Sequence, residues 1–194
     1  MRLFVALVPP RQVLRGLDAA ARPLMDARPD AGDALRWTAD ADRHLTLAFL
    51  GEVDPGTLPG LGERLERAAH RHPPMTLRLA GAGRFGDRVL WAGVAGDTDA
   101  LRHLAGSVAA AARRCGIAVE EGRAFRAHVT LARGRGRGGA RGPGLRPHVA
   151  ALAEYESEAW TADRIALIHS LPPAPGVPGA RPRYETAGTW ALGR

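Results

Sequence analysis

Two short stretches of the chain carry residue types that perform acid–base chemistry. Residues 44–48 read HLTLA, and residues 128–132, 84 positions later, read HVTLA. The polar members are His44, Thr46, His128 and Thr130. In an extended strand successive side chains alternate between two faces, so each stretch is expected to present an imidazole and a hydroxyl on one face and apolar residues on the other. Two such strands facing each other would surround one cleft with two histidines and two threonines.

This set of side chains suits the transfer of a phosphoryl group by paired proton transfers. A histidine pKa near 6.5 allows one ring to be neutral and the other to be protonated near pH 7. One ring then removes a proton from attacking water, while the other supplies a proton to the leaving group. The threonine hydroxyls donate to phosphoryl oxygens, where negative charge accumulates. Neither His44 nor His128 has a carboxylate or cysteine at ligand spacing, so we expect no metal and no cofactor.

The chain resembles the two-histidine (2H) phosphoesterases, and most closely the bacterial RNA 2′,3′-cyclic phosphodiesterases once named 2′-5′ RNA ligases (LigT-like). The similarity runs nearly from end to end. The matching segments are 2–7 (RLFVAL), 44–53 (HLTLAFLGEV), 84–94 (RFGDRVLWAGV), 125–133 (FRAHVTLAR) and 184–192. The resemblance implies an enzyme that hydrolyses RNA 2′,3′-cyclic phosphates to a phosphomonoester, with a 2′-phosphate as the expected product.

The resemblance also implies individual roles for four residues. His128 would be the general base on water and His44 the general acid for the leaving ribose oxygen, although the symmetry of the chemistry leaves the swapped assignment open. Arg133 matches a family arginine near the phosphate, where a guanidinium forms strong charge-assisted hydrogen bonds. Phe49 matches a family aromatic residue that stacks on the base.

The spacing of Phe49 and Arg133 conflicts with simple strand alternation. Each follows its histidine by five residues, so in a straight strand each side chain would point to the face opposite that histidine. They reach the histidine face only if each strand ends or bulges after Leu47 and after Leu131. The equal offset in the two copies favours a shared bulge or strand end, whereas straight strands would make Phe49 a core residue.

The elements around these motifs predict an α+β fold. Apolar residues at helical spacing predict three helices, and alternating or β-branched runs predict strands. The expected helices are 11–27, 57–72 and 99–115; the expected strands are 2–8, 35–38, 44–50, 75–79, 88–95, one containing His128, 155–160, 163–171 and 183–191, with a hairpin turn at 81–86. We expect a single bilobal, pseudo-symmetric domain over residues 1–194, with two mainly antiparallel sheets, outer helices and a central cleft.

Charge and composition constrain partners and location. The net charge is +7, and all 27 basic residues are arginine. Five of these arginines fall in residues 133–146, which contain no acid, so the Arg/Gly-rich segment 133–147 is expected to be a mobile loop that is either merely solvated or contacts RNA. The single Cys115 excludes an internal disulfide. No apolar run approaches the ~20 residues of a membrane span, and the sequence shows no leader, so we expect a cytoplasmic protein with no membrane partner. We also expect a monomer that acts on RNA ends or nucleotides.

Two alternatives use the same residues differently. The first is 2′-5′ RNA ligation, which is the reverse reaction and would employ the same two histidines. The second is a non-catalytic RNA-binding module built on the arginine-rich loop and Phe49. That module would bind RNA in a salt-sensitive manner even without the histidines.

Overall fold

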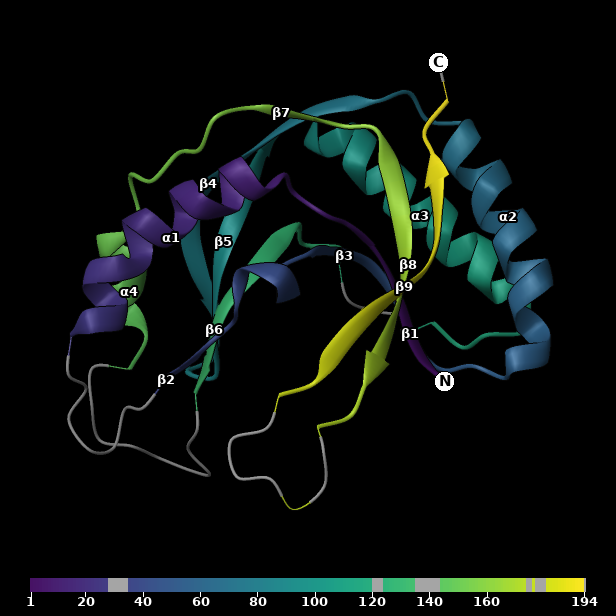
Figure 1. The fold of residues 1–194 in the computed structure, drawn as a ribbon. Coiled ribbons are helices and arrows are strands. Elements are labelled where there is room, and N and C mark those ends of the chain that lie inside the picture. The colour runs from purple at the N-terminus through teal and green to yellow at the C-terminus, as the bar shows by residue number, and fades with distance from the viewer. Residues whose placement is uncertain (28–34, 120–123, 135–143, 174–175, 177–180, 194) are drawn as a thin grey trace.

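The structure of this chain is a computed structural model that describes residues 1–27, 35–119, 124–134, 144–173, 176 and 181–193. The strands are β1 (Arg2–Leu7), β2 (Leu35–Trp37), β3 (Leu45–Glu52), β4 (Met75–Phe85), β5 (Val89–Gly96), β6 (His128–Gly134), β7 (Trp160–Ala162), β8 (Arg164–Leu171) and β9 (Arg183–Ala191). The helices are α1 (Arg11–Asp26), α2 (Leu58–His70), α3 (Thr98–Arg113) and α4 (Arg146–Ala151), with short 3₁₀ turns η1 (Asp40–Asp42) and η2 (Pro55–Thr57). The order and the helix placement are visible in Figure 1.

The described strands form one sheet in the order β7-β4-β5-β6-β3-β1-β8-β9, with β2 added on β6. Every paired neighbour is antiparallel. The order is symmetric about its centre, because β6 and β3 lie in the middle and each is followed outward by three further strands. The α+β class and the pseudo-symmetric arrangement expected from the sequence are therefore confirmed.

The two expected sheets are hydrogen-bonded to each other. They meet at β3 and β6 through a single residue pair, Leu45 opposite Val129. The two halves therefore form one nine-stranded sheet in place of the two separate sheets expected from the sequence. This junction matters for function because both His-x-Thr segments lie on the two strands that meet there.

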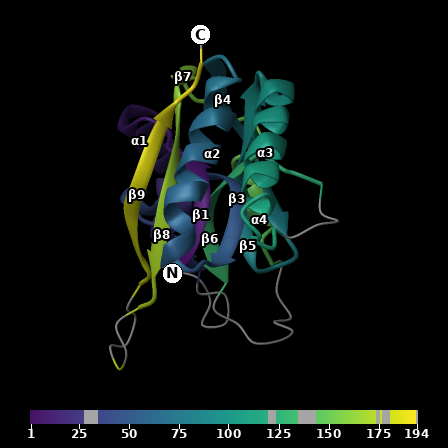
Figure 2. The ribbon, with the colours of Figure 1, turned by 90° about the vertical axis from the view of Figure 1, so that its right-hand side faces the viewer.

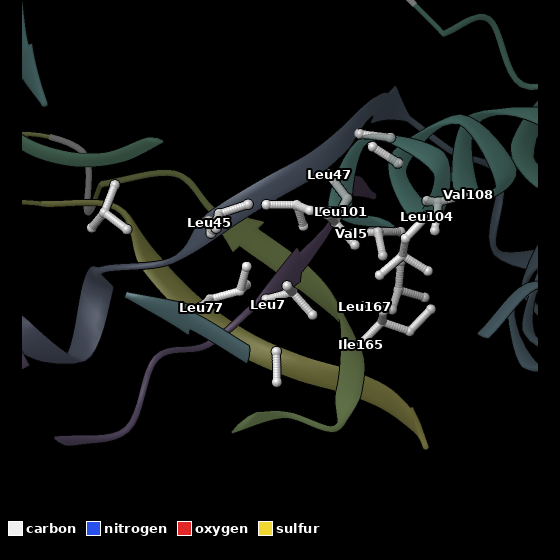
Figure 3. Packing of buried hydrophobic residues seen from close by; sticks show 14 of the residues in the cluster. Val5, Leu7, Leu45, Leu47, Leu77, Leu101, Leu104, Val108, Ile165 and Leu167 are labelled. Atoms are coloured by element: carbon white, nitrogen blue, oxygen red, sulfur yellow. The ribbon is translucent and has the colours of Figure 1, made fainter. Parts of the chain in front are cut away.

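Helices α2 and α3 pack against each other. They lie at the right of the view in Figure 1, while α1 and α4 lie at the left. Figure 2 shows α2 and α3 in front of the sheet. Buried residues from α3 meet residues of β1, β3 and β8 in the main core (Figure 3). These core residues include Val5, Leu45, Leu47, Leu101, Leu104, Val108 and Leu167. The apolar residues of β3 and β6 that alternate with the polar ones therefore face the main core. The polar residues between them lie on the opposite face of the sheet.

A smaller apolar cluster lies on that opposite face. It consists of Phe4, Ala6, Ala166 and Ile168, with Tyr184 packed against it. Phe4 and Ala6 alternate along β1 with residues of the main core, as period-two burial requires. We call the side of the sheet that carries this cluster and the polar residues of β3 and β6 the histidine face.

Some sequence expectations about elements were wrong. Residues 81–85 continue β4 as a strand, and the hairpin turn falls at residues 86–88. The glycines there fit an irregular strand, because Gly81 adopts φ +62° where the β4–β5 register shifts. Residues 155–159 form no extended strand, contrary to expectation. Helix α4 was not expected, because its first residues, Arg146 and Pro147, belong to the low-complexity segment 133–147.

The expected mobile loop 133–147 falls largely on residues 135–143, which lie outside the described residues. Its ends are described: Arg133 and Gly134 belong to β6, and Arg146 and Pro147 begin α4. No described helix combines the length and the apolar character that crossing a lipid bilayer requires.

Candidate active site

The pairing of β3 with β6 places the two His-x-Thr segments side by side. Leu45 lies opposite Val129, so His44 and Thr46 lie on either side of this pair in one segment, and His128 and Thr130 lie on either side of it in the other. Residues next to Leu45 and Val129 project to the face opposite these two core residues. The two histidines are close enough for the charge of His128 to lower the pKa of His44.

A bulge in each motif strand resolves the parity conflict for Phe49 and Arg133. On β3, Thr46 pairs with Ala6 while Ala48 pairs with Val5, so Leu47 is an extra residue. On β6, Thr130 pairs with Trp91 while Ala132 pairs with Leu90, so Leu131 is an extra residue. The extra residue shifts alternation by one position. Phe49 and Arg133 therefore return to the histidine face, as the shared-bulge hypothesis predicts.

His128 is held by its own backbone and by aromatic neighbours. Its Nδ1 donates to the backbone carbonyl oxygen of Arg126 at 2.7 Å. Because a carbonyl can only accept, the neutral ring carries its free lone pair on Nε2. Phe85 lies edge-on to the ring with centroids 4.9 Å apart, and Trp91 lies at 6.0 Å. Gly83 permits this arrangement, because a Cβ there would lie 2.1 Å from the Trp91 ring.

His44 has an equivalent environment on the other half of the sheet. The backbone of Asp42, also two residues earlier in the chain, acts on its ring and raises its pKa. Phe4 and Tyr184 pack against the imidazole, with centroid separations of 4.4 and 5.2 Å. Phe49 lies 6.0 Å from Phe4 and is 59% exposed, so one face of its ring is open to solvent. Each histidine therefore has its own aromatic cluster.

The environment lowers the pKa of both histidines. Burial lowers the pKa of His44 to about 4, with further contributions from the positive charges of Arg133 and His128, while the Asp42 backbone acts in the opposite direction. Burial also lowers the pKa of His128, as do Arg133 and Arg126. Because Arg133 acts on both rings, its guanidinium lies near both. The rings are thus neutral near pH 7 until an anion arrives, and a bound anion raises their pKa again.

A buried ion pair anchors the chain immediately before His44. Arg43 is only 2% exposed, and its guanidinium forms ion pairs with Asp18 of α1 and, at 3.4 Å, with Asp40 of η1. Tyr155 lies close enough for this pair to influence its pKa, which burial raises. The start of β3 is thereby tied to α1 and η1. A charged side chain buried in this way is tolerated because it is paired.

The residues named from sequence converge on one region of the histidine face. His44, His128 and Arg133 influence one another electrostatically, and the register places the two half-buried threonines between them. Sequence reasoning did not identify the aromatic and arginine neighbours of the histidines. These are Phe4, Phe85, Arg126 and Tyr184. They lie on other strands or loops, so no local motif indicated them.

Among the described residues, no three histidine, cysteine, aspartate or glutamate side chains are grouped so that they could hold a metal ion. Of the other described histidines, four lie on or beside helices, namely His70, His72, His103 and His148, and His169 lies on β8. His72 is half-buried and hydrogen-bonds to Ser107 at 2.8 Å, which fits a structural role.

The curved antiparallel sheet with two His-x-Thr strands at its centre defines the class of two-histidine phosphoesterases. Within that class, the chain belongs to the 2′-5′ RNA ligase superfamily, whose family description matches residues 14–172. The sequence resemblance is therefore confirmed.

Three comparisons illustrate the relationship. An RNA 2′,3′-cyclic phosphodiesterase of Geobacillus stearothermophilus is 39% identical over 101 residues, which is 50% of this chain and only 32% of that protein. The protein of the same name from Escherichia coli K12 is 35% identical over 136 residues, covering 68% of this chain and 71% of that protein. The crystal structure of E. coli LigT in apo form superposes with a TM-score of 0.72 at 29% identity, covering 100% of this chain and 98% of that chain.

Proposed function

We propose that this protein hydrolyses RNA 2′,3′-cyclic phosphates by acid–base catalysis with His44 and His128. The observation that carries the proposal is the single β3–β6 pair, because it brings the two His-x-Thr segments together on one face of the sheet. The relatives from Geobacillus and E. coli are named for this activity. RNA ends and nucleotides with a 2′,3′-cyclic phosphate are the substrate class.

In the proposed reaction, His128 Nε2 takes a proton from water as the water oxygen attacks phosphorus. The bond from phosphorus to the ribose 3′ oxygen breaks on the opposite side, and protonated His44 gives that oxygen its proton. The products are a 2′-phosphate and a free 3′ hydroxyl. The Thr46 and Thr130 hydroxyls and the Arg133 guanidinium donate to the phosphoryl oxygens, where charge accumulates. After the reaction the two rings exchange protons with solvent and the cycle repeats.

Phe49 supplies the proposed platform for the base. Its ring is exposed and is supported from one side by Phe4, which itself contacts His44. Stacking of a base on an exposed aromatic ring is largely independent of base identity. The proposed site therefore binds the reacting nucleotide at two points, with the base on Phe49 and the phosphate between the histidines.

The direct test is incubation of the wild-type protein with a 2′,3′-cyclic mononucleotide and with a short RNA ending in a 2′,3′-cyclic phosphate, in excess EDTA. We expect turnover that EDTA leaves unchanged, with a 2′-monophosphate as the product against chromatographic standards of both isomers. A 3′-monophosphate product would reverse the assignment of the leaving oxygen. Absence of turnover on both substrates, from protein shown to be folded by circular dichroism, would refute the proposed activity.

The lowered histidine pKa values predict an acidic optimum for kcat/KM. The reactive form of the free enzyme has one ring protonated, yet both pKa values lie below 6.5 and that of His44 is about 4. Above about pH 6.5 the protonated fraction falls roughly tenfold per pH unit, and kcat/KM should fall with it. Bound phosphate raises the pKa, so kcat should persist to higher pH than kcat/KM. A kcat/KM that stays flat between pH 6.5 and 8 would contradict this expectation.

A further inference from the structure

Strand β2 brings a second arginine to the end of the histidine face. In the β2–β6 ladder, Arg36 lies directly opposite Arg133. Opposite residues of an antiparallel pair project to the same face, with Cβ atoms typically about 4.5–5.5 Å apart. Arg133 is on the histidine face, since its charge acts on both His44 and His128. Arg36 therefore shares that face, and we call Arg36 and Arg133 the arginine pair.

Two like charges in this position are unfavourable unless an anion lies between them. Like charges directly opposite on a sheet destabilise it, and the ion pairs formed among the described residues do not include either member of the arginine pair. Other arginines of the same half do have carboxylate partners, as Arg84 has Asp87 at 2.8 Å and Arg78 has Glu156. The arginine pair thus has the charge and geometry of an anion site.

The location of Arg36 separates it from the reacting phosphate. Arg133 is five residues beyond His128 along β6, which corresponds to roughly 16 Å of strand, and a neighbouring strand lies about 4.8 Å further across the sheet. A long Arg133 side chain extends back toward the histidines, as its effect on their pKa requires. Arg36 is one strand further away, so it is placed for a phosphate next to the reacting one.

We propose that Arg36 binds the internucleotide phosphate on the 5′ side of the cyclic phosphate, next to the reacting phosphate that Arg133 contacts, so that RNA ends are preferred over cyclic mononucleotides. This inference rests on the proposed hydrolysis of cyclic phosphates. A mononucleotide has no such phosphate, whereas every longer RNA end has one. A planar guanidinium with its fork of N–H donors matches the oxygens of a phosphodiester.

The test compares two substrates that differ by one phosphodiester: a 2′,3′-cyclic mononucleotide and a dinucleotide that ends in the same cyclic nucleotide. For Arg36→Ala, kcat/KM on the dinucleotide should fall about 10–100-fold, the size expected when a charge-assisted hydrogen bond is lost. That loss should exceed the loss on the mononucleotide by about tenfold or more, and it should appear mainly in KM. Arg36→Lys keeps the charge without the fork and should recover part of the loss.

The matched control is Arg113→Ala, which removes the same charge from the exposed end of α3. This variant should treat the two substrates as the wild type does. Equal losses on both substrates in Arg36→Ala would show that Arg36 supports the structure or the reacting phosphate, and would overturn the proposal. Unchanged kcat/KM on the dinucleotide would overturn it as well.

A binding measurement separates this proposal from the proposed function. Calorimetric titration with a dinucleotide 2′-monophosphate, which is not turned over, should show weaker binding to Arg36→Ala than to the wild type. If the wild type hydrolyses neither cyclic substrate, the proposed activity fails while this titration still tests Arg36. Equal affinity of the wild type and Arg36→Ala in the titration would overturn the phosphate site by itself.

Discussion

Alanine in place of either His44 or His128 is expected to lower kcat for cyclic-phosphate hydrolysis by about 10²–10⁴-fold, because each ring performs a proton transfer in the transition state. The double variant should be little worse than the more damaged single variant, since the two rings act as one unit. Initial rates on a 2′,3′-cyclic mononucleotide measure both effects. The fold should be retained, because both rings lie on the surface-facing side of the central strands and outside the main core.

His103→Ala is the control for these variants. His103 is exposed on α3, which packs against the opposite face of the sheet, so turnover should match the wild type. Two outcomes would redirect the functional assignment. Full activity in His44→Ala or His128→Ala would exclude that ring from the chemistry, and salt-sensitive RNA binding that survives both changes without any turnover would favour the non-catalytic RNA-binding module.

Loss of Arg43 is expected to cause the largest change in stability. Arg43→Ala should lower the free energy of unfolding by about 3–5 kcal/mol, because it leaves the Asp18 carboxylate without its buried partner. Chemical denaturation followed by circular dichroism measures this difference. Because Arg43 immediately precedes His44, the same change also loosens the entry to β3, so activity should be lost at a lower temperature than in the wild type.

Two further variants isolate the physical cause. Arg102→Ala removes an exposed partner of Asp99 and should cost less than about 1 kcal/mol, since surface ion pairs contribute little. The double change Arg43→Leu and Asp18→Leu removes both charges and should recover much of the stability lost in Arg43→Ala. An Arg43→Ala variant that loses no more stability than Arg102→Ala would show that the buried ion pair does not stabilise the fold.

The sequence was informative wherever a property depends on a few consecutive residues. Alternation along a strand requires His44 and Thr46 to share a face, and it does the same for His128 and Thr130. The same rule identified the parity conflict of Phe49 and Arg133, and the bulges at Leu47 and Leu131 confirm the solution it favoured.

The sequence was less informative about elements whose identity depends on distant partners. Residues 81–85 are glycine-rich and were expected to turn, yet pairing with β5 and the close approach of Trp91 to Gly83 maintain them as a strand. The two expected sheets are one, because the single pair Leu45–Val129 that joins them has no local signature. Tertiary contacts override local preference in both cases.

By itself, then, the sequence determined the fold class, the two motif strands, and which of their side chains lie together, because these follow from short-range periodicity. Tertiary structure alone decided how the strands meet. Chain segments far apart in sequence supply the aromatic rings beside each histidine, the Asp18 partner of Arg43, and the register that sets Arg36 opposite Arg133. The histidine pKa values belong to this second group, because burial and neighbouring charge exist only once the separate strands have packed.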